Sequence, residues 1–326
     1  MEALNREKGQ LEHKMDGGWT WYDLQTENWD EPVIKELEDR FPEFSEWLGV
    51  ATTLKGKNHL SVRMPDGINP VMLGTIMYTI ASDLDEDREN EQFYFYIDTD
   101  ALITFNLDDE TREMMREPDR VSMLNQCQQP IEGMFVLTRA ILYYFHAGMD
   151  QFETRLREVE SAMRKHNERH LLDRILTSRF ELLYWNNLFI PFQELIAGSK
   201  EGYLDQIKDS RYYQQLLHRV ERMETLFRHY HREIDTLISI DDAVHGFRGN
   251  EIMKTLTIFT VIVTPLTVVG AIWGMNFELL PITKPGWGFT VVMLLTILLT
   301  GGLYFWMYRK GWTGDLLKVR SKDKNI

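Results

Sequence analysis

Four threonines near the C-terminus have the spacing that places their hydroxyls on one side of a helix. They are Thr257, Thr260, Thr264 and Thr267, and they lie in a stretch, residues 255–277, without Asp, Glu, Lys or Arg. At about 100° per residue, their hydroxyls fall within a sector of about 80°. This polar line has two interpretations. The hydroxyls can bond back to the carbonyl four residues earlier and pack against another helix, or they can contact a polar species that moves along the helix.

The same helix face extends beyond the threonines in both directions. It reaches Asn250 and Met253 before them and Ala271 after them. Gly274, Met275 and Asn276 then follow at the end of the uncharged stretch. The glycine allows the chain to leave the helix, and Asn276 offers an amide oxygen and an amide nitrogen at the end of the polar face. Alone, such a tripeptide is typical of an ordinary helix end.

Two uncharged stretches, residues 255–277 and 285–308, are long enough to cross a membrane, which takes about 20 helical residues. Arg248 and Lys254 precede the first stretch. Six lysines and arginines follow the second, whereas the connecting loop contains only Glu278 and Lys284. Because positive residues favour the cytosolic side, this distribution predicts a cell-membrane protein with two spans, both chain ends in the cytosol and the short loop outside.

The composition excludes some classes of function. The 326 residues carry a net charge of -14, and nucleic-acid binding requires clustered positive charge, so we expect no nucleic-acid partner. Cys127 is the single cysteine, so no disulfide can form within the chain, and a reducing compartment is indicated for the large polar part. The sequence shows no nucleophile–base arrangement and no phosphate-binding loop, and we therefore predict that the protein is not an enzyme.

The first part of the chain, to about residue 125, has the pattern of a mixed α/β domain. Short runs of aromatic and β-branched residues predict strands at 60–64, 93–97 and 102–105. Apolar residues at helical spacing predict one helix over residues 31–47.

Helical patterns continue from about residue 130 to 197, and glycines at 198 and 202 are expected to end them. No proline follows Gly202 until Pro265, and apolar residues recur at spacings of three and four from Leu204 to Val244. This pattern predicts one long helix that continues into the first membrane span.

We therefore predict an α+β membrane protein in which a cytosolic α/β domain is followed by a long stalk helix that continues into the first of two C-terminal transmembrane helices. The predicted segments are the cytosolic α/β domain with a helical hairpin (1–200), the stalk helix (203–254), the first, pore-lining transmembrane helix (255–276), the external loop (277–286), the second transmembrane helix (287–308) and a basic cytosolic tail (309–326).

From Asn250 to about Tyr308, the sequence resembles the CorA family of divalent-cation channels. Residues 250–257 are similar to the family's segment that enters the membrane, residues 265–267 resemble its Pro-Leu-Thr, and Gly274-Met275-Asn276 matches its signature loop. The rest of the chain is similar in architecture only.

The resemblance implies a homopentamer in the lipid bilayer, with the first spans around a pore for divalent metal ions. It implies that a ring of Asn276 selects hydrated Mg²⁺, with Gly274 and Met275 shaping the loop, and that Met253 and Leu256 form the gate. The expected pore-lining residues are Asn250, Met253, Leu256, Thr257, Thr260, Thr264, Thr267 and Ala271, and Glu278 belongs to the external loop.

Some positions depart from the family pattern. Relatives are often closed by Mg²⁺ bound between cytosolic domains, and Gln215 stands here where an aspartate is common. Other acids that could serve are Asp98, Asp100, Asp108 and Asp109. The main transported ion is expected to be Mg²⁺. The sequence leaves open a transporter of Zn²⁺, Co²⁺ or Ni²⁺ with the same fold, and a membrane-anchored sensor that moves no ion.

Overall fold

The computed structural model describes residues 10–26, 29, 31–80, 90–164, 170–275 and 286–312. The chain divides into two compact units, Met1–Ile238 and Ser239–Ile326. The strands are β1 (Gln10–Lys14), β2 (Thr20–Leu24), β3 (His59–Arg63), β4 (Val71–Tyr78), β5 (Glu91–Ile97) and β6 (Ala101–Phe105). The helices are α1 (Pro32–Arg40), α2 (Pro42–Ala51), α3 (Asp109–Met115), α4 (Pro118–Gln126), α5 (Pro130–Arg164), α6 (Leu171–Ile207), α7 (Arg211–Trp273) and α8 (Gly288–Arg309).

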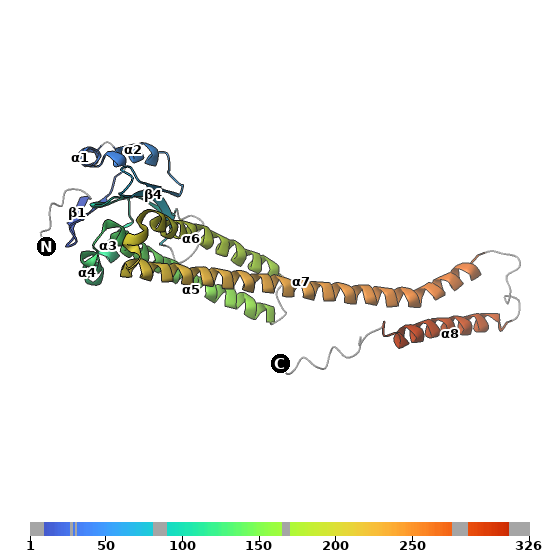
Figure 1. The fold of residues 1–326 in the computed structure, drawn as a ribbon. Helices are drawn as coiled ribbons and strands as arrows, with labels where there is room; N and C mark the ends of the chain where they lie inside the picture. Colours follow the sequence, from blue (N-terminus) through green and yellow to red (C-terminus); the bar gives the residue numbers. More distant parts are fainter. Residues whose placement is uncertain are drawn as a thin grey trace. The chain divides into compact units, whose positions relative to one another are not determined.

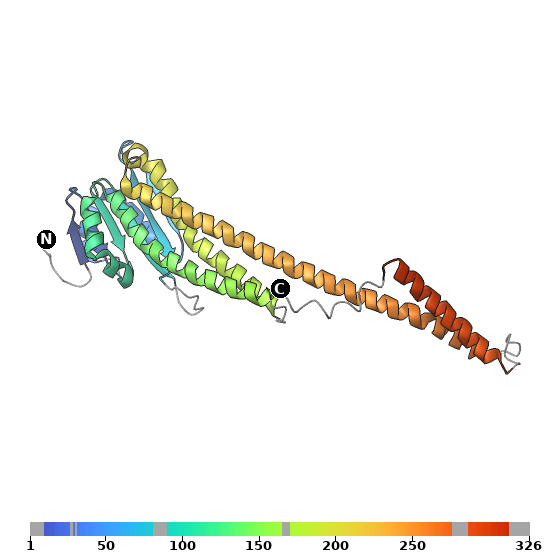
Figure 2. The same cartoon turned by 90° about the horizontal axis from the view of Figure 1, so that it is seen from below.

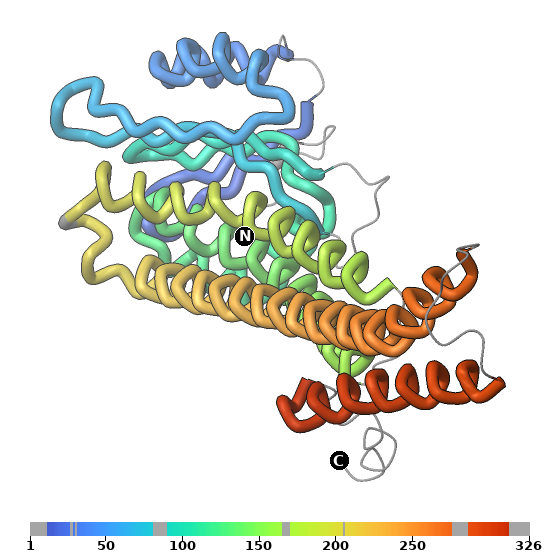
Figure 3. Tube along the Cα trace, turned by 90° about the vertical axis from the view of Figure 1, so that its right-hand side faces the viewer, coloured from blue at the N-terminus to red at the C-terminus, as the bar shows by residue number. Residues whose placement is uncertain are grey.

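The first unit is built around a six-stranded sheet in the order β1-β2-β6-β5-β4-β3. Only β2 and β6 pair in parallel among these neighbours. Helices α1 and α2 cover one face, and α5, α6 and α7 lie on the other (Figure 1, Figure 3). Strand β5 supplies both cores because its side chains alternate: Phe93, Phe95 and Ile97 join the core under α5–α7, and Tyr94 and Tyr96 join the core under α1 and α2.

Helices α5, α6 and α7 pack along one another within the first unit (Figure 2). Aromatic pairs connect them: Phe152 of α5 lies 5.4 Å from Tyr230 of α7, and Phe189 of α6 lies 5.3 Å from Phe227 of α7, between ring centroids. The apolar residues of α7 that recur three and four apart are buried from Leu216 to Leu237, which confirms this part of the predicted pattern, whereas Leu204 is exposed and belongs to α6. The buried residues are Leu216, Val220, Met223, Phe227, Tyr230, Ile234 and Leu237.

The three predicted strands are confirmed as β3, β5 and β6, whereas the single helix predicted over residues 31–47 is wrong. Two helices, α1 and α2, occupy this region and meet at Phe41, whose backbone is extended at φ -125° and ψ 90°. The next residue, Pro42, explains the break, because proline disfavours the helical conformation in the residue before it.

Gly198 and Gly202 both lie within α6, and the helical geometry breaks just after them, at Leu204 (φ 8°, ψ -85°), before the helix ends at Ile207. Their role is to let β3 approach. A Cβ at Gly198 would lie 2.6 Å from Cδ2 of Leu60, and one at Gly202 would lie 2.9 Å from Cγ1 of Val62. The long helix α7 begins at Arg211 rather than near residue 203.

A buried ion pair connects β2 to α3 in the first unit. Nε of Arg112 lies 2.9 Å from Oδ2 of Asp23, and the two side chains are 10% and 2% exposed. The Thr104 hydroxyl of β6 donates to Oδ1 of Asp23 at 3.1 Å. Burial raises the pKa of the Asp23 carboxyl, and the guanidinium of Arg112 opposes this effect. The ionised carboxylate therefore depends on Arg112.

We expect Arg112→Met to lower the free energy of unfolding by about 3 kcal/mol at neutral pH, because it leaves a buried charge without its partner. Without Arg112, the pKa of the Asp23 carboxyl in the folded protein rises further above its unfolded value. The protonated carboxyl then favours folding at low pH, and this contribution is lost as the pH rises through the folded-state pKa. The deficit should therefore shrink on acidification toward the raised pKa. Melting curves of the purified full chain at several pH values test this, with Arg112→Met/Asp23→Asn as the control that should lose the pH dependence. An equal deficit at all these pH values would contradict it.

The second unit contains the C-terminal part of α7 and the whole of α8. Both helices are long and apolar enough to cross a membrane. Many of their large apolar side chains are exposed in the single chain, among them Phe259 on α7 and Phe289 and Leu298 on α8. Exposed apolar surface of this kind is expected of helices that contact lipid or other membrane helices.

Candidate functional site

The four threonines of the polar line lie on an exposed side of α7. Thr257, Thr260, Thr264 and Thr267 are all exposed, whereas Ile258 and Pro265 on another side of the same helix are buried. Each hydroxyl donates to the carbonyl four residues earlier, at distances of 2.8, 2.8, 2.7 and 3.0 Å in chain order. The back-bonding that the sequence suggested is therefore present.

These hydrogen bonds to the helix backbone also determine which hydrogen-bonding groups the threonines present to a ligand. A hydroxyl has one proton, and here the helix backbone uses it, so that only the lone pairs of each oxygen remain free. The exposed line is therefore a series of hydrogen-bond acceptors about 5 Å apart along the helix. A hydrated cation presents the hydrogens of its waters outward and needs acceptors around it, so the two interpretations of the threonine line are compatible.

The other predicted lining residues of α7 are exposed in the single chain as well. They are Asn250, Met253, Leu256 and Ala271, with Met253 62% and Leu256 56% exposed. Helix α7 ends at Trp273, and the amide of Gly274 still donates to the carbonyl of Gly270 at 2.9 Å. Met275 is exposed. Asn276 and Glu278 lie outside the described residues.

Two of the acids considered for a regulatory site have local roles in the first unit. Oδ1 of Asp98 accepts the amides of Asp100 and Ala101, each at 2.8 Å, and so shapes the β5–β6 turn. Burial raises the pKa of the Asp98 carboxyl. Asp108 caps α3 by accepting the amide of Thr111 at 2.7 Å, and it also accepts the Tyr78 hydroxyl.

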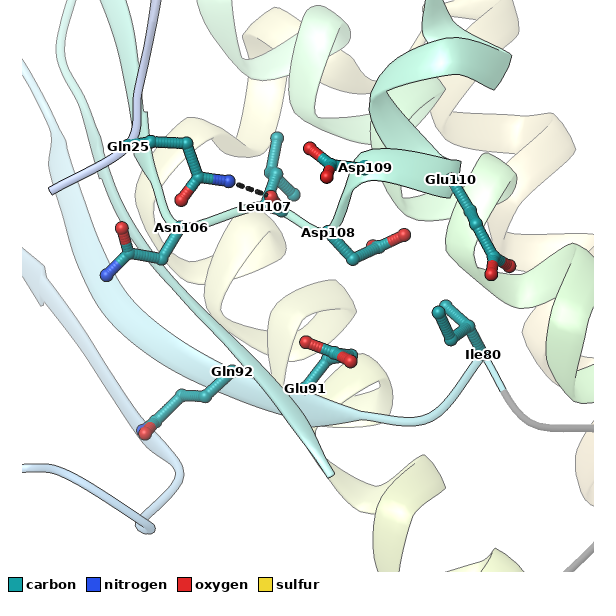
Figure 4. Close-up of a pocket in the computed structure, with 9 residues that line it drawn as sticks. All are labelled: Gln25, Ile80, Glu91, Gln92, Asn106, Leu107, Asp108, Asp109 and Glu110. Atoms are coloured by element: carbon teal, nitrogen blue, oxygen red, sulfur yellow. Dashed lines mark hydrogen bonds between the residues drawn. The ribbon is translucent and has the colours of Figure 1, made fainter. Parts of the chain in front are cut away.

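Asp108 and Asp109 lie together at an acidic pocket of ≈ 400 Å³ beside the start of α3 (Figure 4). Glu110 and Glu91 complete its acidic lining. Within the described ranges, however, no three His, Cys, Asp or Glu side chains are arranged to hold a metal ion. The pocket therefore offers negative charge without a preformed metal site.

Gln215, which stands at the position of the common aspartate, is bound within the chain. Its Oε1 accepts a hydrogen bond from Nη1 of Arg139 on α5. No sequence pattern indicates this contact, because the two residues lie far apart in the chain and their approach depends on how α5 and α7 pack.

Comparisons with known proteins agree on one family and one fold. The family described as CorA-like Mg²⁺ transporter protein matches residues 16–309. The magnesium transport protein CorA of Bacillus subtilis (strain 168) is 29% identical over 309 residues, which are 94% of this chain and 95% of that protein.

Solved structures share the fold at low sequence identity. The complete structure of the CorA magnesium transporter from Methanocaldococcus jannaschii matches with a TM-score of 0.64 and 18% identity, over 90% of this chain and 92% of that one. The ZntB cytoplasmic domain from Vibrio parahaemolyticus matches with a TM-score of 0.51 and 11% identity, over 74% of this chain and 99% of that one. At these identities, the similarities establish the fold, and with it the predicted α+β architecture with two C-terminal membrane helices.

Proposed function

The chain belongs to the family of CorA-like Mg²⁺ transporter proteins, a family of divalent-cation transporters, and we propose that it admits Mg²⁺ to the cytosol as a homopentameric channel. The observation that carries this proposal is the exposed line of acceptor-only threonines on α7. One chain supplies one wall of a pathway, and five copies around an axis would enclose it.

The proposed filter is a ring of five Asn276 side chains, shaped by Gly274 and Met275. Mg²⁺ holds its water tightly, so a cage of carboxylates that strips the ion would hold it too strongly for transport. Neutral amide oxygens can accept hydrogen bonds from the hydration shell instead, and the threonine oxygens can do so further along. Several weak sites in series allow the ion both to enter and to leave.

The proposed gate is formed by Met253 and Leu256, since rings of apolar side chains close a pore by excluding water. Both termini would lie in the cytosol, with the loop that contains Glu278 outside. A membrane potential, negative inside, then drives entry: about 2.3 kcal/mol per charge per 100 mV gives about 4.6 kcal/mol for a divalent ion.

A transporter of Zn²⁺, Co²⁺ or Ni²⁺ is the second candidate, because relatives differ in their named ions. A relative from M. jannaschii, 26% identical over half of this chain, is a cobalt/magnesium transport protein, and the ZntB cytoplasmic domain shares the fold. Since the same fold serves proteins with different named ions, the choice of ion has to be measured.

Purified protein in liposomes that contain a Mg²⁺-sensitive dye tests the proposal. We expect rapid Mg²⁺ entry that hexaamminecobalt, a mimic of hydrated Mg²⁺, blocks. Robust Zn²⁺, Co²⁺ or Ni²⁺ entry without Mg²⁺ entry would instead favour the second candidate. If correctly folded protein transported none of these ions, the remaining interpretation would be a membrane-anchored sensor.

Thr264→Val tests the acceptor line, because valine has nearly the shape of threonine and lacks the oxygen. Loss of one hydrogen bond of about 1 to 1.5 kcal/mol at this level should slow Mg²⁺ entry roughly tenfold. Thr264→Ser keeps the hydroxyl and should stay close to the original rate. Equal rates for the valine and serine variants would show that the Thr264 oxygen does not contact the ion's water.

A further inference from the structure

Three arginines and Gln215 share one face at the start of α7. Arg211, Gln215, Arg219 and Arg222 follow one another at spacings of four, four and three, which places them on the same side of the helix over its first turns. The chain as a whole is acidic, with 50 Asp and Glu against 36 Lys and Arg. A concentration of positive charge on one face is therefore unusual for this protein.

Arg139 of α5 joins this face through two hydrogen bonds. Its Nη1 donates to Oε1 of Gln215. Nη1 of Arg219 donates to the backbone carbonyl of Arg139 at 2.8 Å. Both arginines are partly buried, and Nε of Arg139 is buried with no hydrogen-bond partner among the described residues. The two guanidinium groups are thus held in place while part of their donor capacity is unused.

The positive charges are close enough to act on one another. The pKa of Arg139 is lowered by burial first, then by Arg120 of α4 and by Arg211. The pKa of Arg219 is lowered by burial, then by Arg139, Arg222 and Arg120. Arginine nevertheless stays protonated. We name Arg120, Arg139, Arg211, Arg219 and Arg222 the arginine cluster.

The arginine cluster lacks the counter-charges that other arginines of this unit have. Arg155 pairs with Glu181, and Arg179 lies 3.0 Å from Asp235. By contrast, none of the five cluster arginines forms an ion pair with a carboxylate in the part of the chain that the structure describes. The side chains of Arg211 and Arg222 are exposed. The arginine cluster therefore offers five guanidinium groups, without a carboxylate partner among the described residues, to an anion from outside the chain.

We propose that the arginine cluster binds carboxylates on the surface of a second copy of this chain, so that permanent charges hold neighbouring copies together at this face. The inference rests on the proposed function in that it takes the protein to assemble with copies of itself. Charge complementarity favours this occupant, because copies with a net charge of -14 repel one another overall. The arginine cluster is a place where the acidic surface of a neighbour is attracted instead.

The proposal makes a specific statement about metal dependence. Guanidinium–carboxylate pairs form without a divalent ion and weaken as salt screens them. The assembly should therefore persist in a chelator and loosen in high salt.

The first test reverses the two exposed charges, Arg211→Glu with Arg222→Glu, in the detergent-purified full chain. Native mass spectrometry should show the original protein as an oligomer in a chelator and the double variant largely dissociated. Arg63→Glu with Arg157→Glu changes the net charge equally at arginines that have partners of their own, Glu46 and Glu153, and should stay assembled. Equal assembly of both double variants would overturn the proposal.

The second test identifies the partner without reversing any charge. Arg222→Lys keeps the positive charge and adds an amine that a carbodiimide joins directly to a neighbouring carboxylate. Peptide mass spectrometry should find residue 222 joined to an Asp or Glu of another copy, which isotope-mixed copies distinguish from a link within one chain. The original protein could instead bind inorganic phosphate, lose this binding in the Arg211→Glu/Arg222→Glu variant, and form no cross-link between copies. This result would show a small-anion site and overturn the proposal.

The liposome assay on the same preparation separates this inference from the proposed function. If the protein transports ions and the charge-reversed variant still assembles, the arginine contact is refuted and the transporter proposal stands. If the charge reversal disrupts assembly but the original protein transports no ion, the arginine contact is supported and the channel proposal is refuted.

Discussion

Asn276→Ala is expected to lower Mg²⁺ entry into liposomes by about a hundredfold. Each amide in the proposed ring accepts hydrogen bonds from the ion's water, and alanine offers no acceptor. Loss of two such bonds at about 1.4 kcal/mol each corresponds to a hundredfold change. The variant should still be recovered as folded, assembled protein, because the Asn276 amide is proposed to contact only the ion's water. Dye fluorescence in liposomes with equal amounts of either protein measures the rate.

The matched control for this prediction is Asn276→Asp, which keeps the size and the acceptor oxygens and adds five negative charges to the ring. A charged ring should bind Mg²⁺ more strongly and release it more slowly, so that entry saturates at a lower external concentration and a lower maximal rate. If Mg²⁺ entered liposomes through well-folded Asn276→Ala protein at the original rate, the amide ring would not be the filter.

The features predicted from the sequence are those that neighbouring residues determine. The line of threonines depends only on helical spacing, and the structure confirms that these residues share an exposed side of α7. Strands β5 and β6 were predicted because their runs of aromatic and β-branched residues are uninterrupted. Strand β4 was missed: it contains Gly74 and is buried on almost every residue, so it lacks the alternation that identifies a half-exposed strand.

The errors concern features that distant residues determine. Gly198 and Gly202 have the local character of a helix end, but the helical geometry breaks only at Leu204, and the approach of Leu60 and Val62 explains why glycine occupies these two positions. Likewise, the contact between Arg139 and Gln215 joins residues on different helices. No spacing rule could pair them, because the pairing depends on how α5 and α7 pack.

Gly148 provides the strongest test of the packing between α5 and α6. A Cβ at this position would lie 2.3 Å from Cη2 and 2.5 Å from Cζ2 of Trp185 on α6, closer than real contacts allow. Trp185 is fully buried and packs against Phe145, with ring centroids 5.6 Å apart, so its indole has little room to move. Glycine at this position therefore allows the two helices to approach.

Two effects predict opposite signs for the change in stability caused by Gly148→Ala. Helix propensity alone predicts stabilisation by about 1 kcal/mol. The contact with Trp185 predicts destabilisation by about 3 kcal/mol, since overpacking a rigid core is costly, or a fall in melting temperature of roughly 6–12 °C for a unit of this size. We expect the contact to prevail, and we expect Gly148→Leu to yield no folded protein.

A double variant separates crowding from any other effect of the substitution at Gly148. Trp185→Phe removes the ring atoms that the new Cβ would meet, at the cost of a cavity. Combined with Gly148→Ala, it should restore part of the lost stability, so that the two substitutions together cost at least about 1 kcal/mol less than the sum of their separate effects. Melting curves of the four proteins measure this coupling. Additive costs, or a stabilising Gly148→Ala, would show that α5 and α6 have more room at this contact than the structure indicates.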